Sequence, residues 1–453
     1  MTTSTERTLT AAMSGGLVNR LVPIAVAIGF GWIFFSPVSH NYLLYPLFAA
    51  LGIAAFIAII RRNPMIDMHL WAIAFLIIAL ALYGMIRGNG NPGLVFTIAV
   101  YVAAPALYLL CVAAATLTLL RVVMIAAVLG TLAVSGLLLV YVAGESGAIP
   151  QIVPAWLEAG TGLGATFRDG SSQARSWGLS SLAALGPIWV GSLLVRRDAM
   201  LPHWSIRLLC AVAATATSVV SNRTAIVLVI ALAPIIALVV ILFLRSRQYR
   251  KRTSRHSQLI WAAGAAATIV AVALAWTKLS SFGPIANMID AIASFFGVES
   301  NSAETNQDIR SNQAWHLIRA WQANPILGAG FGADVPDYAR TSEKPWVLEL
   351  QYHYLLFTVG LIGISILLAI LVTGLLFLRQ ASTRQPALVP TLVATATGAI
   401  AMLIANATNP YLQAPGHQWA IFFPLAVATI MLRSNDTDDA AGPLSAGKTE
   451  RTL

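Results

Sequence analysis

The chain has 453 residues, of which 58% are hydrophobic and only 10% are charged, and its formal net charge is +10. An ordinary soluble domain carries about 25% charged residues and rarely contains runs of ~20 apolar residues, whereas such runs recur along almost this whole chain. The composition therefore excludes a typical soluble protein and predicts an all-α integral membrane protein. A membrane β-barrel is excluded as well, because its strands would appear as short segments of alternating hydrophobicity.

The apolar runs predict about twelve transmembrane helices, each close to the ~20 residues needed to cross a bilayer. The first run follows Arg20 and a polar start, so it is expected to be a retained span and not a cleaved signal. Pro105 and Arg121 interrupt the long apolar tract 94–143, in which we place two spans. The predicted spans are 21–36, 42–60, 69–86, 94–113, 122–143, 177–195, 204–220, 224–244, 257–277, 351–378, 386–408 and 418–433.

Basic residues predict the orientation, because Lys and Arg accumulate in cytoplasmic connections. With the N-terminus inside, the short outer connections contain only Arg87 and Arg223. The excess positive charge is therefore interpreted as topology and not as nucleic-acid binding. The cytoplasmic connections hold Arg61, Arg62, Arg121, Arg196, Arg197, Arg245, Arg247, Arg250, Lys251, Arg252, Arg255, Arg379 and Arg384.

Four regions follow from this plan. Residues 1–277 form about nine membrane helices with an outer loop over 144–176, residues 278–350 form a large outer loop, residues 351–433 add about three membrane helices, and 434–453 form a cytoplasmic tail. The segment NPILGAGFG, residues 324–332, is expected to be a tight turn closing a helix over 309–323. Helical spacing in the large loop predicts two amphipathic helices, one with Ile285, Met288, Ile289, Ile292 and Phe296 and one with Ala314, Leu317, Ile318 and Trp321.

Three arginines lie at the predicted outer ends of helices. Arg168 and Arg175 precede the sixth span, and Arg223 lies in Ser-Asn-Arg-Thr between two apolar runs. A guanidinium near membrane depth is costly, so it is expected to be paired, to face a polar cavity or to reach toward the interface. Arg168 and Arg175 have Asp169 or lipid headgroups as alternative partners. Together the three make a plausible clamp for phosphate, which suits bidentate guanidinium contacts.

His353 is the strongest candidate for proton transfer. It lies at the predicted outer membrane surface beside Glu349, Gln351, Tyr352 and Tyr354. An imidazole whose ordinary pKa is near ~6.5 suits proton abstraction at neutral pH, although packing at a helix start is the alternative. Solvated, interfacial or packed positions are expected for the other histidines, which are His40, His69, His203, His256, His316 and His417.

A metal site is not expected, because no HExxH or DxD spacing occurs at an outer helix end and Asp334-Val335-Pro336-Asp337 lies in a turn-rich loop. No other cofactor is expected. NPILGAGFG is not interpreted as a dinucleotide loop, because no strand precedes it.

Four segments form a pattern when they are taken in chain order. They are Arg175-Ser176-Trp177-Gly178, Ser221-Asn222-Arg223, Arg310 with Trp315 through NPILGAGFGA, and YHYLLFTVGLIG, which contains His353. Together they resemble the O-antigen ligase and O-antigen polymerase family of bacterial membrane glycosyltransferases. The resemblance covers roughly residues 160–400. The chain departs from the pattern at Tyr354, where the family often has Asn.

This resemblance implies a GT-C-like fold of the bacterial inner membrane with the active site facing the periplasm under the large loop. It implies metal-independent, inverting transfer of a glycan from undecaprenyl diphosphate to a sugar acceptor, either a second lipid-linked repeat unit or lipid A-core. His353 would be the base, and Arg223 and Arg175 would stabilise the leaving diphosphate. Further substrate contacts would come from Arg168, Arg310, Trp315, Gln351, Tyr352 and Tyr354.

Two other functions fit a chain of about twelve spans. A secondary transporter typically places ionisable residues or broken helices at the bilayer midplane. A flippase of lipid-linked oligosaccharides would line a cavity inside the spans with charge. Here the ionisable residues gather at the outer ends and loops, which favours chemistry at the membrane surface.

Overall fold

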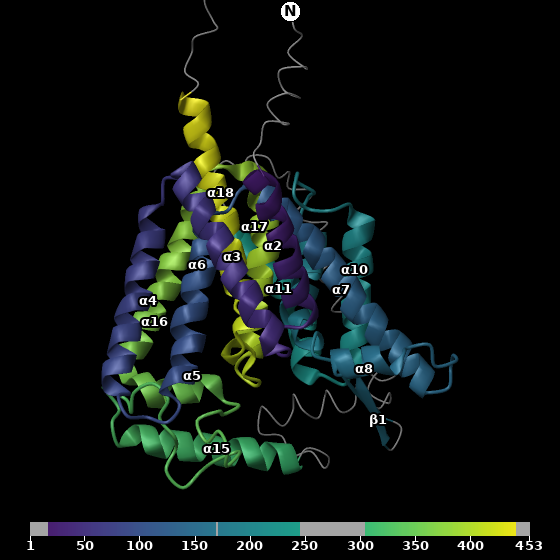
Figure 1. Ribbon diagram of the computed structural model, residues 1–453, viewed down its shortest axis with the longest axis vertical. Coiled ribbons are helices and arrows are strands. Elements are labelled where there is room, and N and C mark those ends of the chain that lie inside the picture. Colours follow the sequence, from purple (N-terminus) through teal and green to yellow (C-terminus); the bar gives the residue numbers. More distant parts are fainter. Residues whose placement is uncertain (1–16, 169–170, 245–303, 441–453) are drawn as a thin grey trace, which may run out of the picture.

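The computed structural model describes residues 17–168, 171–244 and 304–440, whose long helices run back and forth between two ends of one bundle (Figure 1). The first part contains α2 (Leu17–Phe35), α3 (Asn41–Arg62), α4 (Met68–Arg87), α5 (Leu94–Ile98), α6 (Ala104–Ala113), α7 (Leu117–Glu145), α8 (Ala155–Thr161), α9 (Leu182–Leu193), α10 (Trp204–Val220) and α11 (Thr224–Leu244). The second part contains α15 (Glu304–Gln322), α16 (Gln351–Arg384), α17 (Val389–Ala405) and α18 (Trp419–Ala440).

Short helical turns and one hairpin complete the described structure. A π-helical turn, Ala99–Ala103, joins α5 to α6. Strands β1 (Gly164–Arg168) and β2 (Ser171–Arg175) form an antiparallel hairpin within the predicted outer loop, which sequence reasoning did not foresee. The 3-10 turns are Leu179–Ser181, Pro386–Leu388, Tyr411–Gln413 and Pro415–His417.

The prediction of a multi-pass helical membrane protein is confirmed. Eight helical segments among the described residues are long and apolar enough to cross a membrane, and three shorter apolar helices accompany them. The helix predicted to begin at residue 122 begins earlier, at Leu117, because the Thr116 hydroxyl accepts a hydrogen bond from Leu119 N (3.3 Å) and caps it. The predicted span 257–277 and the amphipathic helix near 285–296 lie outside the described residues.

The two ends of the bundle differ in charge. At one end, Arg433 donates to Met65 O (3.2 Å) and Ala115 O (3.3 Å), which gathers three helix ends. At the same end the Asp198 carboxylate accepts from Thr391 N (2.8 Å). Arg61, Arg62, Arg196, Arg197 and Arg384 lie in or next to these connections. Basic side chains are thus concentrated at the end where α2 begins, which is the end that the sequence predicts to be cytoplasmic.

Helix α17 forms the centre of the bundle, where it packs against α9, α11 and α18. Small residues allow α9 and α17 to approach closely. A Cβ added at Gly398 would lie 2.4 Å from Ile188 Cγ1, and one added at Gly191 would lie 3.0 Å from Thr397 Cγ2. Such small-residue contacts are a common way for helices to associate within a membrane, where the surrounding lipid is as apolar as the helices.

Helix α16 is broken at Gly360, whose φ of 58° and ψ of −167° are not helical. The predicted span 351–378 therefore contains two helices separated by this break. Residues 361–384 alone give roughly 36 Å of helix at 1.5 Å per residue, which is enough to cross a bilayer core. Residues 351–359, which include His353, form a separate short helix at the end of the bundle away from the basic connections.

The predicted turn after α15 fills this break. A helix break leaves backbone groups unpaired, and within apolar surroundings each of them needs a partner. The glycine-rich segment supplies partners on both sides of Gly360. The bonds are Ala329 N to Phe357 O (3.0 Å), Gly330 N to Thr358 O (2.7 Å), Leu361 N to Pro325 O (3.0 Å) and Ile362 N to Ile326 O (3.2 Å).

Substitution of Gly360 by Ala is expected to destabilise the protein strongly. The position requires a positive φ, and an added Cβ would lie 2.5 Å from both Gly328 N and Ile326 O. Backbone strain of this kind costs on the order of 1–3 kcal/mol before the clash is counted. Thermal unfolding in detergent would measure the loss. Gly374→Ala on the same helix is the matched control, because its Cβ would meet only Leu425 Cδ2 at 3.8 Å. Equal stability of the two variants would contradict the prediction.

Candidate functional site

Helix α15 lies across one end of the bundle, where it packs on the short first part of α16 (Figure 1). A small apolar cluster joins them, and it includes Leu317, Leu348, Leu350, Tyr354 and Phe357. Tyr354 is 3% exposed, and its hydroxyl donates to Ala333 O (3.4 Å). Sugar stacking by Tyr354 remains a prediction, while its observed position is one of packing.

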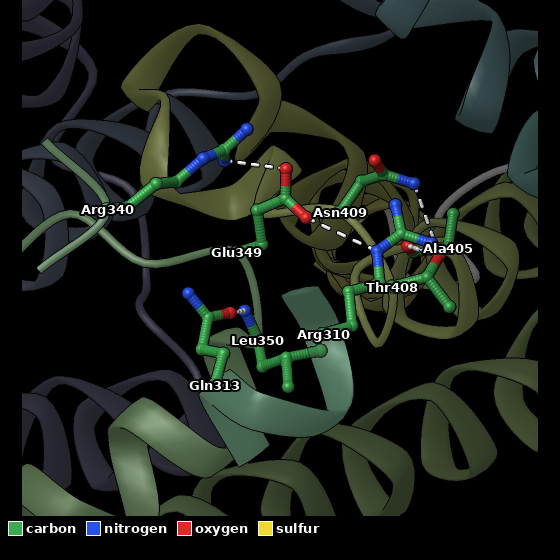
Figure 2. A network of polar contacts seen from close by, with 8 residues as sticks. All are labelled: Arg310, Gln313, Arg340, Glu349, Leu350, Ala405, Thr408 and Asn409. Carbon is green, nitrogen blue, oxygen red and sulfur yellow. Dashed lines mark hydrogen bonds and ion pairs between the residues drawn. The ribbon is translucent and has the colours of Figure 1, made fainter. Parts of the chain in front are cut away.

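Polar contacts fix the same junction. Figure 2 shows Glu349 between two guanidinium groups, with Arg310 Nε at 3.2 Å and Arg340 Nη1 at 2.6 Å. The buried Gln313 side chain on α15 accepts a hydrogen bond from Leu350 N (3.0 Å). The position of α15 over the start of α16 is therefore set by both charge and packing.

The first turn of α16 presents three predicted site residues in different ways. Gln351 is 1% exposed and donates to the Tyr101 hydroxyl (2.8 Å). Tyr352 is 39% exposed and donates to Leu403 O (2.6 Å) at the end of α17. His353 is of intermediate exposure, and no hydrogen bond to its ring is found among the described residues. Its imidazole is thus available to a ligand, whereas Gln351 is a buried contact between helices.

The connection between α17 and α18, residues 406–418, ties several elements to this junction. Gln413 Nε2 donates to Leu348 O (3.0 Å), just before Glu349. Gln418 Nε2 donates to Val100 O (2.7 Å) in the π-helical turn. Sequence reasoning missed this connection. The available signal was the run of amide, proline and histidine residues between two apolar segments.

His417 joins the connection to the start of α9. Its Nδ1 lies 2.9 Å from Tyr411 O and its Nε2 lies 2.7 Å from the Ser180 hydroxyl oxygen. A carbonyl only accepts, so Nδ1 carries the proton and Nε2 accepts from Ser180. The ring is 1% exposed, and its role is therefore to hold the loop and not to bind a ligand.

Tyr411 brings two of the predicted arginines to one place. Burial raises the pKa of its phenol to about 12, and the positive charges of Arg223 and Arg310 act against that rise. Both guanidinium groups therefore lie close enough for their fields to reach the phenol. In Figure 2 the Arg310 side chain extends from Glu349 toward Thr408 and Asn409, in the same connection as Tyr411. At neutral pH the phenol remains protonated and can donate a hydrogen bond.

Arg223 reaches this place from the turn between α10 and α11. Asn222 adopts a positive φ of 54°, which Asn tolerates better than most residues, and it reverses the chain there. Arg223 N then bonds to Ser218 O (3.2 Å), and α11 begins at Thr224.

Arg175 lies with the hairpin. It is exposed at the end of β2, and its Nε would be 2.8 Å from a Cβ added at Gly164 on the paired strand. Its charge acts on Tyr141 of α7. The backbone of Arg168 ends β1, and its side chain lies outside the described residues. The predicted convergence of Arg175 and Arg168 with Arg223 stays a prediction.

Aromatic side chains line the exposed part of α15. Trp315 is 53% exposed, and the Arg319 guanidinium lies 5.1 Å from its ring centre. His316 stacks on Tyr338, with ring centres 5.1 Å apart. This surface is close in sequence and space to Arg310, so a saccharide held there would be near the arginines.

No protein-family model matches the chain, and no curated protein matches it at a significant level.

Disruption of the contact between His417 and Ser180 is expected to destabilise the loop. His417→Leu leaves the Ser180 hydroxyl and Tyr411 carbonyl without their partner, which costs roughly 1–3 kcal/mol for a buried group. Ser180→Ala should destabilise the protein less, because the His417 ring loses its bond to Ser180 but keeps its bond to Tyr411 O. Thermal unfolding of both single variants and the double variant would give the coupling energy. Additive effects would show that the two side chains do not interact.

Proposed function

We propose that this protein is an inner-membrane glycosyltransferase that moves a glycan from undecaprenyl diphosphate to a sugar acceptor on the periplasmic face. The observation that carries the proposal is that the charges of Arg223 and Arg310 both act on Tyr411, in the connection that Gln413 ties to Leu348 just before the His353 helix. This group lies at the end of the bundle opposite the basic connections. Departure from the family pattern at Tyr354 favours polymerase-type elongation over ligation to lipid A-core.

Guanidinium groups suit the leaving group of this reaction. When the glycosidic bond to the lipid breaks, negative charge grows on the diphosphate, and donors fixed in advance lower the barrier most. Arg223 and Arg310 supply the compensating positive charge, and the Tyr411 hydroxyl, on which both act, adds a neutral donor. Attack on the anomeric carbon opposite the diphosphate would invert its configuration.

His353 supplies the base. A sugar hydroxyl is not ionised at neutral pH, so the acceptor must lose its proton to a group within hydrogen-bond reach. The imidazole is partly exposed at the same end of the bundle, and the chain before it is anchored by Gln351 and Glu349. The unprotonated nitrogen of the His353 ring would take the proton of the acceptor hydroxyl as the new glycosidic bond forms.

An apolar cavity between α2, α3, α6, α7 and α18 runs along α18 from Trp419 to Ile430. Its lining includes Ala58, Ala115 and Leu119, which lie near the basic connections and away from the arginines. We therefore assign it no part in binding the donor.

Replacement of His353 or Arg223 by Ala is expected to abolish transfer. Loss of a general base lowers the rate by about 10²–10⁴-fold, and loss of an arginine that stabilises the leaving group lowers it by a similar factor. The measurement is release of undecaprenyl diphosphate by purified protein given lipid-linked oligosaccharide and an acceptor. His203→Ala, at the opposite end of the bundle, is the control and should keep full activity.

Normal turnover by either variant would defeat the proposed roles. Supplying a second lipid-linked repeat unit or lipid A-core as the acceptor would separate a polymerase from a ligase. Arg223→Lys should recover little activity, because an ammonium cannot make the bidentate contact of a guanidinium.

Turnover is expected to persist in the presence of a metal chelator, since the arginines are assigned the charge stabilisation that divalent ions provide elsewhere. The assay is the same release of undecaprenyl diphosphate with and without excess chelator. Loss of activity that returns on addition of a divalent ion would contradict this assignment.

A further inference from the structure

One carboxylate holds two guanidinium groups from different segments at the site. Arg310 comes from α15, Arg340 comes from the connection between α15 and α16, and Glu349 lies just before α16. Arg310 Nε contacts Glu349 Oε2 at 3.2 Å and Arg340 Nη1 contacts Oε1 at 2.6 Å. In Figure 2 the two arginines approach the carboxylate from opposite sides, each at its own oxygen.

This arrangement matches what a phosphate group offers. A carboxylate and a phosphate both present two oxygens on one central atom, and a phosphate adds further oxygens and more negative charge. Each guanidinium has five N–H donors in a planar fork, so both arginines have the capacity for stronger bidentate contacts than they make with Glu349. The pair therefore favours a phosphate over the carboxylate it now holds.

Solvent exposure of the two arginines lowers the free energy needed to replace Glu349 by another anion. The Arg310 and Arg340 side chains are 41% and 47% exposed, whereas Glu349 is 18% exposed. Half-exposed ion pairs contribute little net stability, because water and salt screen them. An arriving anion can thus replace Glu349 without disturbing the packing of Leu317, Leu350 and Tyr354 beneath.

We propose that Arg310 and Arg340 form a phosphate clamp whose resting occupant is the Glu349 carboxylate, which the diphosphate headgroup displaces on binding. The inference rests on the proposed function for the identity of that headgroup. Glu349 competes for the same arginines after the reaction, so it limits the affinity for the diphosphate product and promotes its release.

The test measures binding of inorganic pyrophosphate to the full-length protein in detergent by calorimetry at low salt. Glu349→Gln removes the competing charge and keeps the side-chain shape, so it should bind pyrophosphate on the order of tenfold more tightly. Arg340→Ala removes one side of the clamp and should bind on the order of tenfold more weakly. Glu349→Asp keeps the charge and should stay close to wild type.

Glu343→Gln is the matched control. It removes the same charge from the same connection, where Glu343 is exposed and has no ion-pair partner among the described residues. Equal tightening by Glu343→Gln would show a general charge effect and overturn the proposal. Unchanged or weaker binding by Glu349→Gln would also overturn it, as would unchanged binding by Arg340→Ala or no binding by wild type. If Glu349→Gln fails to fold, the proposal requires weaker binding by Arg340→Ala together with unchanged binding by Glu349→Asp.

These measurements do not depend on catalysis. If the predicted pyrophosphate affinities are found but no glycan is transferred, the clamp is supported and the proposed reaction is contradicted. If glycan is transferred but none of the affinity changes is found, the reaction is supported and the clamp is contradicted. In an active protein, Glu349→Gln should also lower kcat and strengthen inhibition by added pyrophosphate, which a purely structural ion pair would not do.

Discussion

The hydrogen bonding at Gly360 is the constraint on which the rest of the site depends. Because α16 breaks there, its backbone needs outside partners, and the segment 325–330 supplies them. The same segment is held on its other side by the connection between α4 and α5, where Asn91 Nδ2 donates to Ala329 O (3.1 Å). This contact directs residues 351–359 along the end of the bundle, fixes α15 above them and so determines where Arg310, Glu349 and His353 lie.

The membrane class, most of the helices and helix α15 could be predicted from the sequence, because these depend on hydrophobic runs and on helical spacing. Arg223 could also be selected, since a guanidinium group between two apolar segments is unusual, and Arg310 was selected through the resemblance. The break at Gly360 could not be predicted, because a lone glycine in an apolar run is common in membrane helices and its φ depends on a partner segment far along the chain. The hairpin at 164–175 was missed for a related reason, since its short strands are polar.

The structure of the 406–418 connection, which contains Tyr411, could not be predicted from sequence composition. His417 was expected to be interfacial, yet it is buried and joins Ser180 to Tyr411 O. No periodic pattern marks such a connection, because its conformation comes from amide and imidazole bonds to distant backbone groups. Its residues become important only when α9, α16 and the π-helical turn surround them, which is a property of the assembled bundle.

The contact between α4 and the glycine-rich segment has a consequence for biosynthesis. Asn91 and Ala329 are separated by 238 positions. The end of α4 is synthesised long before its partner segment, so the backbone groups of residues 84–93 that later bind this segment must first be paired with water or lipid headgroups. The contacts of the glycine-rich segment can therefore form only after the chain has been made through the start of α16, so the backbone at Gly360 gains its partners late in synthesis.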